Sequence, residues 1–187
     1  AKWSETYKIT YDACGGYFRG DKKQTSITYD MNEGTCLTNE EPSNADAHKA
    51  FDGWYLDKNY TQKIEKMSDY YPKENMTIYA KWTDAYKVTY DACGGTFGGT
   101  DQTYMVSVKK GNTVNSVWTP SYEGKEFEGW YLDAAYTKPV GNVYEYVPKE
   151  DTTFYAKWSE TYKITYDACG GYFGSADTTV STYYIKK

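Results

Sequence analysis

The chain has 187 residues, a net charge of −5 and an aromatic content of 19%, and these values already exclude several classes of protein. Its Lys and Arg residues are scattered singly, so there is no basic stripe to bind a nucleic acid backbone or anionic lipid. No apolar stretch approaches the roughly 20 residues of a membrane-spanning helix, and we expect no membrane insertion in this segment. The 23 tyrosines favour half-buried β-strands over helices.

One long block of sequence occurs three times. Ala1 to Phe18 reads AKWSETYKITYDACGGYF, Ala156 to Phe173 repeats it letter for letter, and Ala80 to Phe97 is a close variant. A second block, Phe51 to Asp57, returns as Phe127 to Asp133 with one change. The period is the size of a small domain. It predicts four segments: the end of a preceding repeat with a linker at 1–6, complete repeats at 7–82 and 86–158, and a partial third repeat, its first hairpin, at 162–187.

The chain opens on the end of one repeat and closes partway through another, so we expect a segment of a longer array. Only three residues separate Trp82 from Tyr86, and three separate Trp158 from Tyr162. Such short connections leave little room for independent motion. We therefore expect stiff joints between the repeats.

Each repeat is expected to end in a strand. Thr77–Trp82 and Thr153–Trp158 share the sequence T-x-Y-A-K-W, and alternate residues from Ile78 to Trp82 are predicted to face the core. The signal for a helix is weak. Thr61–Ser68 has a modest helical period, but the matching part of the second repeat contains Pro and Gly, so any helix is expected to be short.

In the second repeat, Tyr86–Tyr90 and Tyr104–Lys109 alternate large and polar residues, which is typical of half-buried strands. The glycine-rich stretch between them predicts a hairpin with a long loop, and the first repeat is expected to form the same hairpin. Phe127 and Trp130 would point to opposite faces of a regular strand. Because Gly129 permits a bulge between them, we predict that both rings are buried.

Three ordered motifs, Y-D-A-x-G-G, F-x-G-W-Y-x-D and T-x-Y-A-K-W, span nearly the whole repeat. Together they resemble the Listeria-Bacteroides repeat, also called the internalin B-repeat. The resemblance implies an α+β, predominantly β, module of β-grasp-like fold that forms an extended tandem array in extracellular bacterial surface proteins. It implies a stalk or an interaction segment at the cell surface, without catalysis. We therefore expect a structural role, as a stalk or fibre-forming element, and no cofactor.

The four cysteines, Cys14, Cys36, Cys93 and Cys169, are the candidates for a disulfide or for a cross-link between chains. The family usually has Asn at the three turn positions, so the resemblance does not explain these thiols. A Cys14–Cys93 bond is excluded by the repeat spacing, because a disulfide needs Cα atoms within about 7 Å. A Cys14–Cys36 bond requires the long loop to fold back, and bonds between chains or simple inheritance of the cysteine by duplication stay open.

No constellation for catalysis or metal binding stands out. There is no Cys-x-x-Cys pair, and the single histidine, His48, leaves too few ligands for the usual zinc sites. The acidic pairs Glu40-Glu41 and Glu150-Asp151 lie in polar stretches and are typical of solvated turns. We therefore expect no enzyme.

A carbohydrate- or protein-binding adhesin module is the alternative function. Tyr17, Tyr55, Tyr131 and Tyr172 occupy matching positions and could form a repeated platform for a surface glycan, although ordinary strand packing explains them more simply. The expected partners are further repeats or copies of the chain, joined through thiols or unpaired edge strands, or else a glycan or a host protein.

Overall fold

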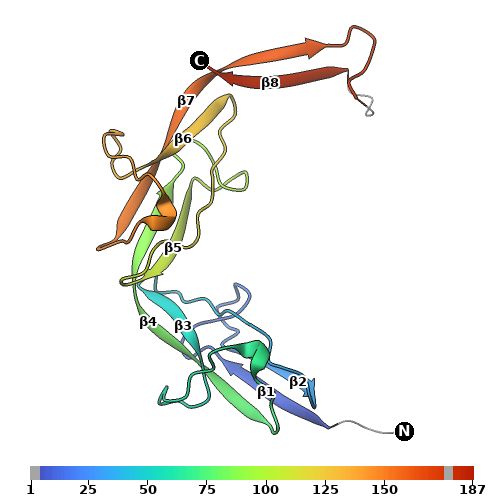
Figure 1. The fold of residues 1–187 in the computed structure, drawn as a ribbon, viewed down its shortest axis with the longest axis vertical. Helices are drawn as coiled ribbons and strands as arrows, with labels where there is room; N and C mark the ends of the chain where they lie inside the picture. The colour runs from blue at the N-terminus through green and yellow to red at the C-terminus, as the bar shows by residue number, and fades with distance from the viewer. Residues whose placement is uncertain (1–4, 175–178) are drawn as a thin grey trace. The chain divides into compact units, whose positions relative to one another are not determined.

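The computed structural model describes residues 5–174 and 179–187, and nearly all regular structure in this part of the chain is β (Figure 1). The described residues form eight strands: β1 (Thr6–Asp12), β2 (Ser26–Asn32), β3 (Lys49–Tyr55), β4 (Met76–Asp91), β5 (Thr103–Lys109), β6 (Lys125–Tyr131), β7 (Thr152–Asp167) and β8 (Val180–Lys186). Two single-turn 3-10 helices, η1 (Met67–Asp69) and η2 (Val143–Glu145), are the helical elements there. No helix in the described residues is long and apolar enough to cross a bilayer.

The α part of the predicted α+β class is therefore wrong for the described residues, while the predominantly β part is confirmed. No helix forms after β3 because the segment that follows it pairs with β3. Leu56 donates its backbone N–H to Gln62, and Ile64 donates to Trp54, so the chain folds back along β3 as an extended partner. Those backbone groups are not free to form helical hydrogen bonds.

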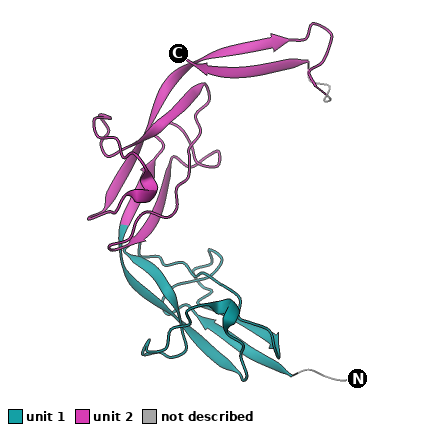
Figure 2. Cartoon of the chain, viewed as in Figure 1, with its two compact units in different colours: residues 1–86 teal, residues 87–187 magenta. Residues whose placement is uncertain are grey.

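The chain divides into two compact units, residues 1–86 and 87–187 (Figure 2). Most of the predicted segment 1–6 and part of the partial third repeat, residues 175–178, lie outside the described residues.

Both units use the same strand topology. In the first, β1 pairs antiparallel with β2 and parallel with β4, and β4 pairs antiparallel with β3. In the second, β4 pairs with β5 and, in parallel, with β7, and β7 pairs antiparallel with β6. The predicted hairpins are confirmed, and so is the bulge, since the register shifts between Phe127 and Gly129 and between Phe51 and Gly53.

Two 16-residue strands, β4 and β7, each belong to two repeats. The first part of β4 closes repeat 1, and its last residues open repeat 2 by pairing with β7. Likewise β7 closes repeat 2 and then pairs with β8. At both places the closing strand of one repeat continues directly into the opening strand of the next, with no loop residue between them.

Each unit has an aromatic core around one tryptophan of the F-x-G-W motif. In unit 1, the Trp54 ring stacks on Phe18 at 6.2 Å and meets Tyr11 edge-on at 5.2 Å. In unit 2, the Trp130 ring has equivalent contacts with Phe97 at 6.3 Å and Tyr90 at 5.0 Å.

The predicted core face of the closing strand is confirmed, since Ile78 and Ala80 are fully buried and Trp82 packs against the same core. Trp130 is buried as predicted, and Phe127 is half-buried against the core of unit 2.

Candidate functional site

The Cys-Gly-Gly turn is built in the same way in all three repeats. The Asp12 carboxylate accepts the backbone N–H of Cys14 at 2.8 Å, and the equivalent Asp–Cys pair has the same distance in the other two repeats. The three cysteines Cys14, Cys93 and Cys169 have φ of 45°, 47° and 46°. This left-handed backbone conformation is uncommon for residues other than Gly, Asn and Asp. Each turn therefore holds its cysteine at a conformational cost.

A tryptophan of the closing strand fixes the first two turns. The Trp82 indole N–H donates to the Ala13 carbonyl at 2.8 Å, and Trp158 donates to Ala92 at the same distance. The indole lies so close that a Cβ added to Gly16 would be 2.4 Å from the Trp82 ring. The second glycine of the motif is therefore required for close approach of the closing strand.

The thiols of these two turns lie against a tyrosine from the loop after β3 or β6. The Tyr60 hydroxyl acts on the Cys14 thiol and lowers its pKa, and Tyr136 does the same for Cys93, so each tyrosine lies close to its cysteine. Burial raises the pKa of the Cys14 thiol, and the nearby Asp12 carboxylate raises it further. Burial likewise raises the pKa of the Cys93 thiol. Less thiolate is present at neutral pH as a result, so these cysteines are poor nucleophiles.

The same tyrosine of repeat 1 joins a second ring and a lysine. The rings of Tyr55 and Tyr60 meet edge-on at 5.5 Å, and the Lys81 ammonium lies 5.0 Å from the centre of the Tyr55 ring. The Tyr55 hydroxyl donates to Asp52 at 3.0 Å. The Lys81 ammonium is also 4.0 Å from the Asp52 carboxylate, so both a ring and a carboxylate balance its charge.

Repeat 2 reproduces this arrangement with a different acid. The Tyr131 and Tyr136 rings are 5.6 Å apart, and the Lys157 ammonium lies 5.3 Å from the Tyr131 ring centre and 3.1 Å from Glu128. The hydrogen bond and the charge of Glu128 raise the pKa of Lys157. Each of the two complete repeats therefore contains a cysteine–tyrosine cluster, which consists of a Cys, two Tyr, a Lys and a carboxylate. Its residues are Cys14, Tyr55, Tyr60, Lys81 and Asp52 in repeat 1, and Cys93, Tyr131, Tyr136, Lys157 and Glu128 in repeat 2.

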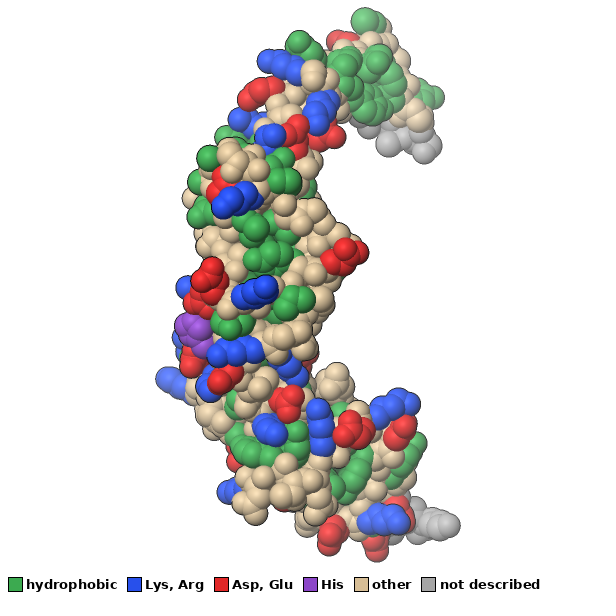
Figure 3. All heavy atoms as spheres, turned by 60° about the vertical axis from the view of Figure 1, so that its left-hand side comes forward, with side chains coloured by type: hydrophobic (Ala, Val, Ile, Leu, Met, Phe, Trp, Pro, Cys, Tyr) green, Lys and Arg blue, Asp and Glu red, His purple; other side chains and the backbone are tan. Residues whose placement is uncertain are grey.

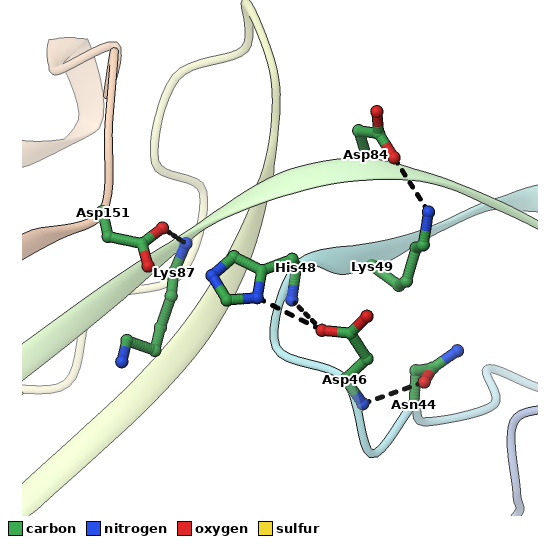
Figure 4. A network of polar contacts seen from close by, with 7 residues as sticks. All are labelled: Asn44, Asp46, His48, Lys49, Asp84, Lys87 and Asp151. Carbon is green, nitrogen blue, oxygen red and sulfur yellow. Dashed lines mark hydrogen bonds and ion pairs between the residues drawn. The ribbon is translucent and has the colours of Figure 1, made fainter.

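The strand crossing from repeat 1 to repeat 2 carries polar contacts near its middle (Figure 4). In unit 1, Asp46 accepts the backbone N–H of His48 at 2.9 Å and faces its ring Nδ1 at 3.2 Å, while Lys49 pairs with Asp84 at 2.8 Å. The His48 side chain is 56% exposed, so the histidine is solvated. Among the described residues, no group of three or more His, Cys, Asp or Glu could hold a metal ion.

A polar residue just before each closing strand binds the start of the opening strand. The Asn75 side-chain oxygen accepts the backbone N–H of Lys8 at 2.8 Å. In repeat 2, the Asp151 carboxylate accepts that of Lys87 at 3.0 Å, as Figure 4 shows. The parallel pairing of opening and closing strand is thereby fixed at its first residue.

Comparison with known proteins identifies the repeats themselves. The family model of the Listeria-Bacteroides repeat domain matches residues 7–81 and 86–157. The chain belongs to this family. It is 28% identical over 162 residues to Internalin H of Listeria monocytogenes, covering 84% of this chain and 26% of that protein. It is also 28% identical over 140 residues to a putative Gly-rich membrane protein of Evansella cellulosilytica, covering 74% of this chain and 15% of that protein.

The chain thus spans about a quarter or less of these two relatives. No solved structure matches it significantly.

All four cysteines that were candidates for a cross-link are free thiols. Cys14 and Cys93 are half-buried in the cysteine–tyrosine clusters, Cys36 is half-buried after β2, and Cys169 is exposed. Cys169 is therefore the turn thiol most open to a partner, and cross-linking between chains stays a prediction.

The four tyrosines proposed as a glycan platform occupy different environments. Tyr55 is only 6% exposed and packs inside its unit, so it does not present a ring face as stacking requires. Tyr131 and Tyr17 are half-buried, and Tyr17 pairs through its backbone with Ser43. Tyr172 is 67% exposed.

Sequence reasoning missed Tyr60 and Tyr136, which bring the clusters together. A signal was available, because the letters L-D-x-x-Y-T occur at Leu56–Thr61 and again at Leu132–Thr137. The Asp of this motif holds the loop. Asp57 accepts the backbone N–H groups of Asn59, Thr61 and Gln62, which places Tyr60 at a φ of 57°.

Proposed function

We propose that the chain is a structural tandem-repeat segment of an extracellular, cell-surface bacterial protein, where it acts as a stalk or fibre-forming element. The observation that carries the proposal is the continuity of β4 and β7, each of which closes one repeat and opens the next without an intervening loop. A linker of flexible residues would decouple neighbouring repeats, whereas a shared strand transmits force along its backbone. The names of the two relatives, an internalin and a membrane protein, agree with a surface location.

Each repeat is best described as a reduced β-grasp. In repeat 1 the order β2-β1-β4-β3 puts an antiparallel partner on each side of a central parallel pair, which is the arrangement of strands in that fold. A loop and the single turn η1 stand where the fold would carry its helix. An extended array of such modules is the architecture that we propose for the whole segment.

A non-catalytic role agrees with the chemistry of the cysteine–tyrosine clusters. Burial raises the pKa of the Cys14 and Cys93 thiols, and Glu128 raises the pKa of Lys157. Both effects oppose the activation that a nucleophilic thiol or amine requires. The clusters instead tie together the turn, the loop and the closing strand of each repeat.

Small-angle X-ray scattering on the chain tests the stalk proposal. We expect a radius of gyration well above the value of about 16 Å for a compact globule of this length. A variant with a Gly-Ser insertion after Thr83 should broaden the distribution of interatomic distances, because it interrupts β4 between the repeats. A compact particle, or a distribution unaffected by the insertion, contradicts the proposal.

Glycan recognition is the second candidate function, and one observation favours it. Trp118 is 51% exposed although its ring lies 5.4 Å from that of Tyr104, so part of the indole is open to solvent. Exposed indoles stack on sugars readily. Screening the chain on a glycan array, with Trp118→Ala as the control, tests this function, and binding lost in the variant would favour it over a purely structural role.

A further inference from the structure

One side of strand β5, in repeat 2, has backbone groups that no other strand uses. Among the described strands, β5 pairs with β4 alone (Figure 1). Just before β5, the Gln102 carbonyl accepts the backbone N–H of Ala92, so Gln102 and every second residue after it face β4. The N–H and C=O groups of Thr103 and Met105 therefore point to the opposite side, the outer edge of β5. Within the described residues, no strand or loop is hydrogen-bonded to these groups of Thr103 and Met105.

The side chains along this outer edge are apolar on both faces of the sheet. Met105 is 59% exposed on the outward face. On the inward face, Tyr104 and Val106 pack against the core but are only half-buried, and the half-exposed Trp118 ring lies 5.4 Å from that of Tyr104. The strand has no proline, and its one charged residue is Lys109 at its end. Strands with these properties readily pair with another strand.

The matching strand of repeat 1, β2, carries charges instead. The Tyr29 hydroxyl accepts from Arg19 at 2.8 Å and donates to Glu40 at 2.7 Å. Charged groups of this kind protect an edge strand, because pairing with a second strand would take them out of water. Counted from the backbone bond that precedes each strand, the counterpart of Tyr29 is Val106, and the counterpart of Arg19 after the turn is Gly98. Repeat 2 therefore lacks the protection that repeat 1 has.

We propose that the outer edge of β5 is a self-association surface, where the β5 strands of two copies of the chain pair antiparallel about a two-fold axis at Met105. The residues that point outward supply the hydrogen bonds of the new ladder, and an axis at Met105 meets this condition. The two exposed Met105 side chains then cover each other. On the inward face, Tyr104 of each copy lies opposite Val106 of the other, a pairing of aromatic and β-branched side chains that stabilises sheets.

Charge complementarity favours this register and this occupant. Asp101 and Lys109 lie four residues before and four residues after Met105, so the axis places Asp101 of each copy opposite Lys109 of the other. An axis at Val106 would place Lys109 opposite Thr103 and form no such pair. A parallel pairing of the two strands in register would bring the two Asp101 carboxylates together, which is unfavourable.

Neither the β6 edge nor an anionic polymer fits as well. The β6 edge of repeat 2 is already used, because bonds from Leu132 to Lys138 and from Val140 to Trp130 join it to the segment that follows it. An anionic polymer needs a field of positive charge. The chain has a net charge of −5, and Figure 3 shows acidic and basic side chains interspersed on the face that it presents.

The test is sedimentation equilibrium of the full 187-residue chain, with a reductant present so that disulfide bonds between copies do not contribute. We expect a monomer–dimer equilibrium at concentrations up to about 1 mM. Met105→Lys places two like charges at the centre of the pairing and should weaken the dimer at least about tenfold. Thr28→Lys, at the matching exposed position of β2, is the control and should leave the equilibrium unchanged. Near-ultraviolet circular dichroism checks that both variants are folded.

Cross-linking with a carbodiimide, which joins a carboxylate to an amine that it contacts, tests the register. We expect an amide bond between Asp101 and Lys109 in the dimer, found by mass spectrometry of the digested protein. Within one chain these residues lie at opposite ends of β5, more than about 20 Å apart, so a bond between them joins two copies.

A chain that stays monomeric at about 1 mM overturns the proposal, and so does a dimer that Met105→Lys does not weaken or that lacks the bond between Asp101 and Lys109. A dimer weakened by Thr28→Lys instead would assign the surface to β2 and also overturn it. The proposal rests on the fibre-forming function, since lateral pairing of chains is what it supplies, but the two fail separately. A monomer with the large radius of gyration of an extended chain would overturn only the pairing at β5.

Discussion

The Trp82 indole N–H donates to the Ala13 carbonyl at 2.8 Å, across 69 residues of sequence. This bond joins the last strand of repeat 1 to its first turn, and the equivalent bond in repeat 2 joins Trp158 to Ala92. Both ends of a repeat are therefore tied at one point. Because the parallel pairing of β1 with β4 begins at the other end of the same strands, the closing strand is held along its whole length.

Replacing Trp82 by Phe tests this tie. The substitution keeps an aromatic ring but removes the donor to the Ala13 oxygen, and we expect a loss of about 1–2 kcal/mol in the free energy of unfolding of unit 1. Hydrogen exchange measures the loss unit by unit. Trp118→Phe is the matched control, because the Trp118 indole is largely exposed. The two variants would behave alike if the indole bond contributed nothing.

Replacing the second glycine of the turn by alanine should distinguish the two turns that a tryptophan ring packs against from the third turn, which has no such contact. In Gly16→Ala the new Cβ would lie 2.4 Å from the Trp82 ring, and in Gly95→Ala 2.6 Å from the Trp158 ring. We expect each to cost about 1–3 kcal/mol through overpacking. Gly171→Ala, whose nearest contact is 3.3 Å, should cost less than about 0.5 kcal/mol.

Chemical denaturation of the three glycine variants supplies the measurement. Equal losses at Gly16 and Gly171 would show that backbone conformation alone, and not the tryptophan, demands glycine at this position.

Local pattern was enough to predict the strands but not the loops that complete the clusters. The alternation of large and polar residues predicted the hairpins. The bulge was predicted because Phe127 and Trp130 would point to opposite faces of a regular strand. Both signals come from residues that are close in sequence. The contact of Cys14 with Tyr60 depends on the path of a loop that Asp57 holds through several backbone hydrogen bonds. The absent helix has the same origin, since tertiary pairing along β3 overrode a weak local period.

Removing the Asp12 carboxylate should make the Cys14 thiol more reactive. Burial is the main cause of the raised pKa of Cys14, and the Asp12 charge adds to it. Asp12→Asn keeps an oxygen to accept the Cys14 N–H but removes the charge, so the pKa of the thiol should fall and alkylation by iodoacetamide at pH 8 should become severalfold faster. Mass spectrometry of the labelled peptides gives the rate at each cysteine.

In the same molecule, Cys93 is the internal control, and its rate should not change. Cys169, which is exposed, should be labelled fastest in both proteins. An unchanged rate at Cys14 in the variant would mean that burial alone protects the thiol.

The Glu128 carboxylate should make the attachment of the β7–β8 hairpin to repeat 2 dependent on pH. It lies 2.8 Å from the Lys186 ammonium and 3.1 Å from that of Lys157, and the bond to Lys186 is the main cause of its lowered pKa. A carboxyl whose pKa is depressed on folding contributes stability that is fully present above its unfolded value of 4.5 and is lost as the pH falls through the folded pKa.

We therefore expect the end of β8 to loosen between pH 5 and the lowered folded pKa, while the β1–β2 hairpin does not. The exchange rate of the Lys187 amide, which donates to the Glu160 carbonyl at 3.0 Å, reports this after correction for intrinsic exchange. Glu128→Gln should give the loosened state at neutral pH and remove the pH dependence, and Glu123→Gln, at an exposed loop position before β6, should not. If the Lys187 amide of the Glu128→Gln protein still loosened with acid, a different carboxyl group would have to be responsible.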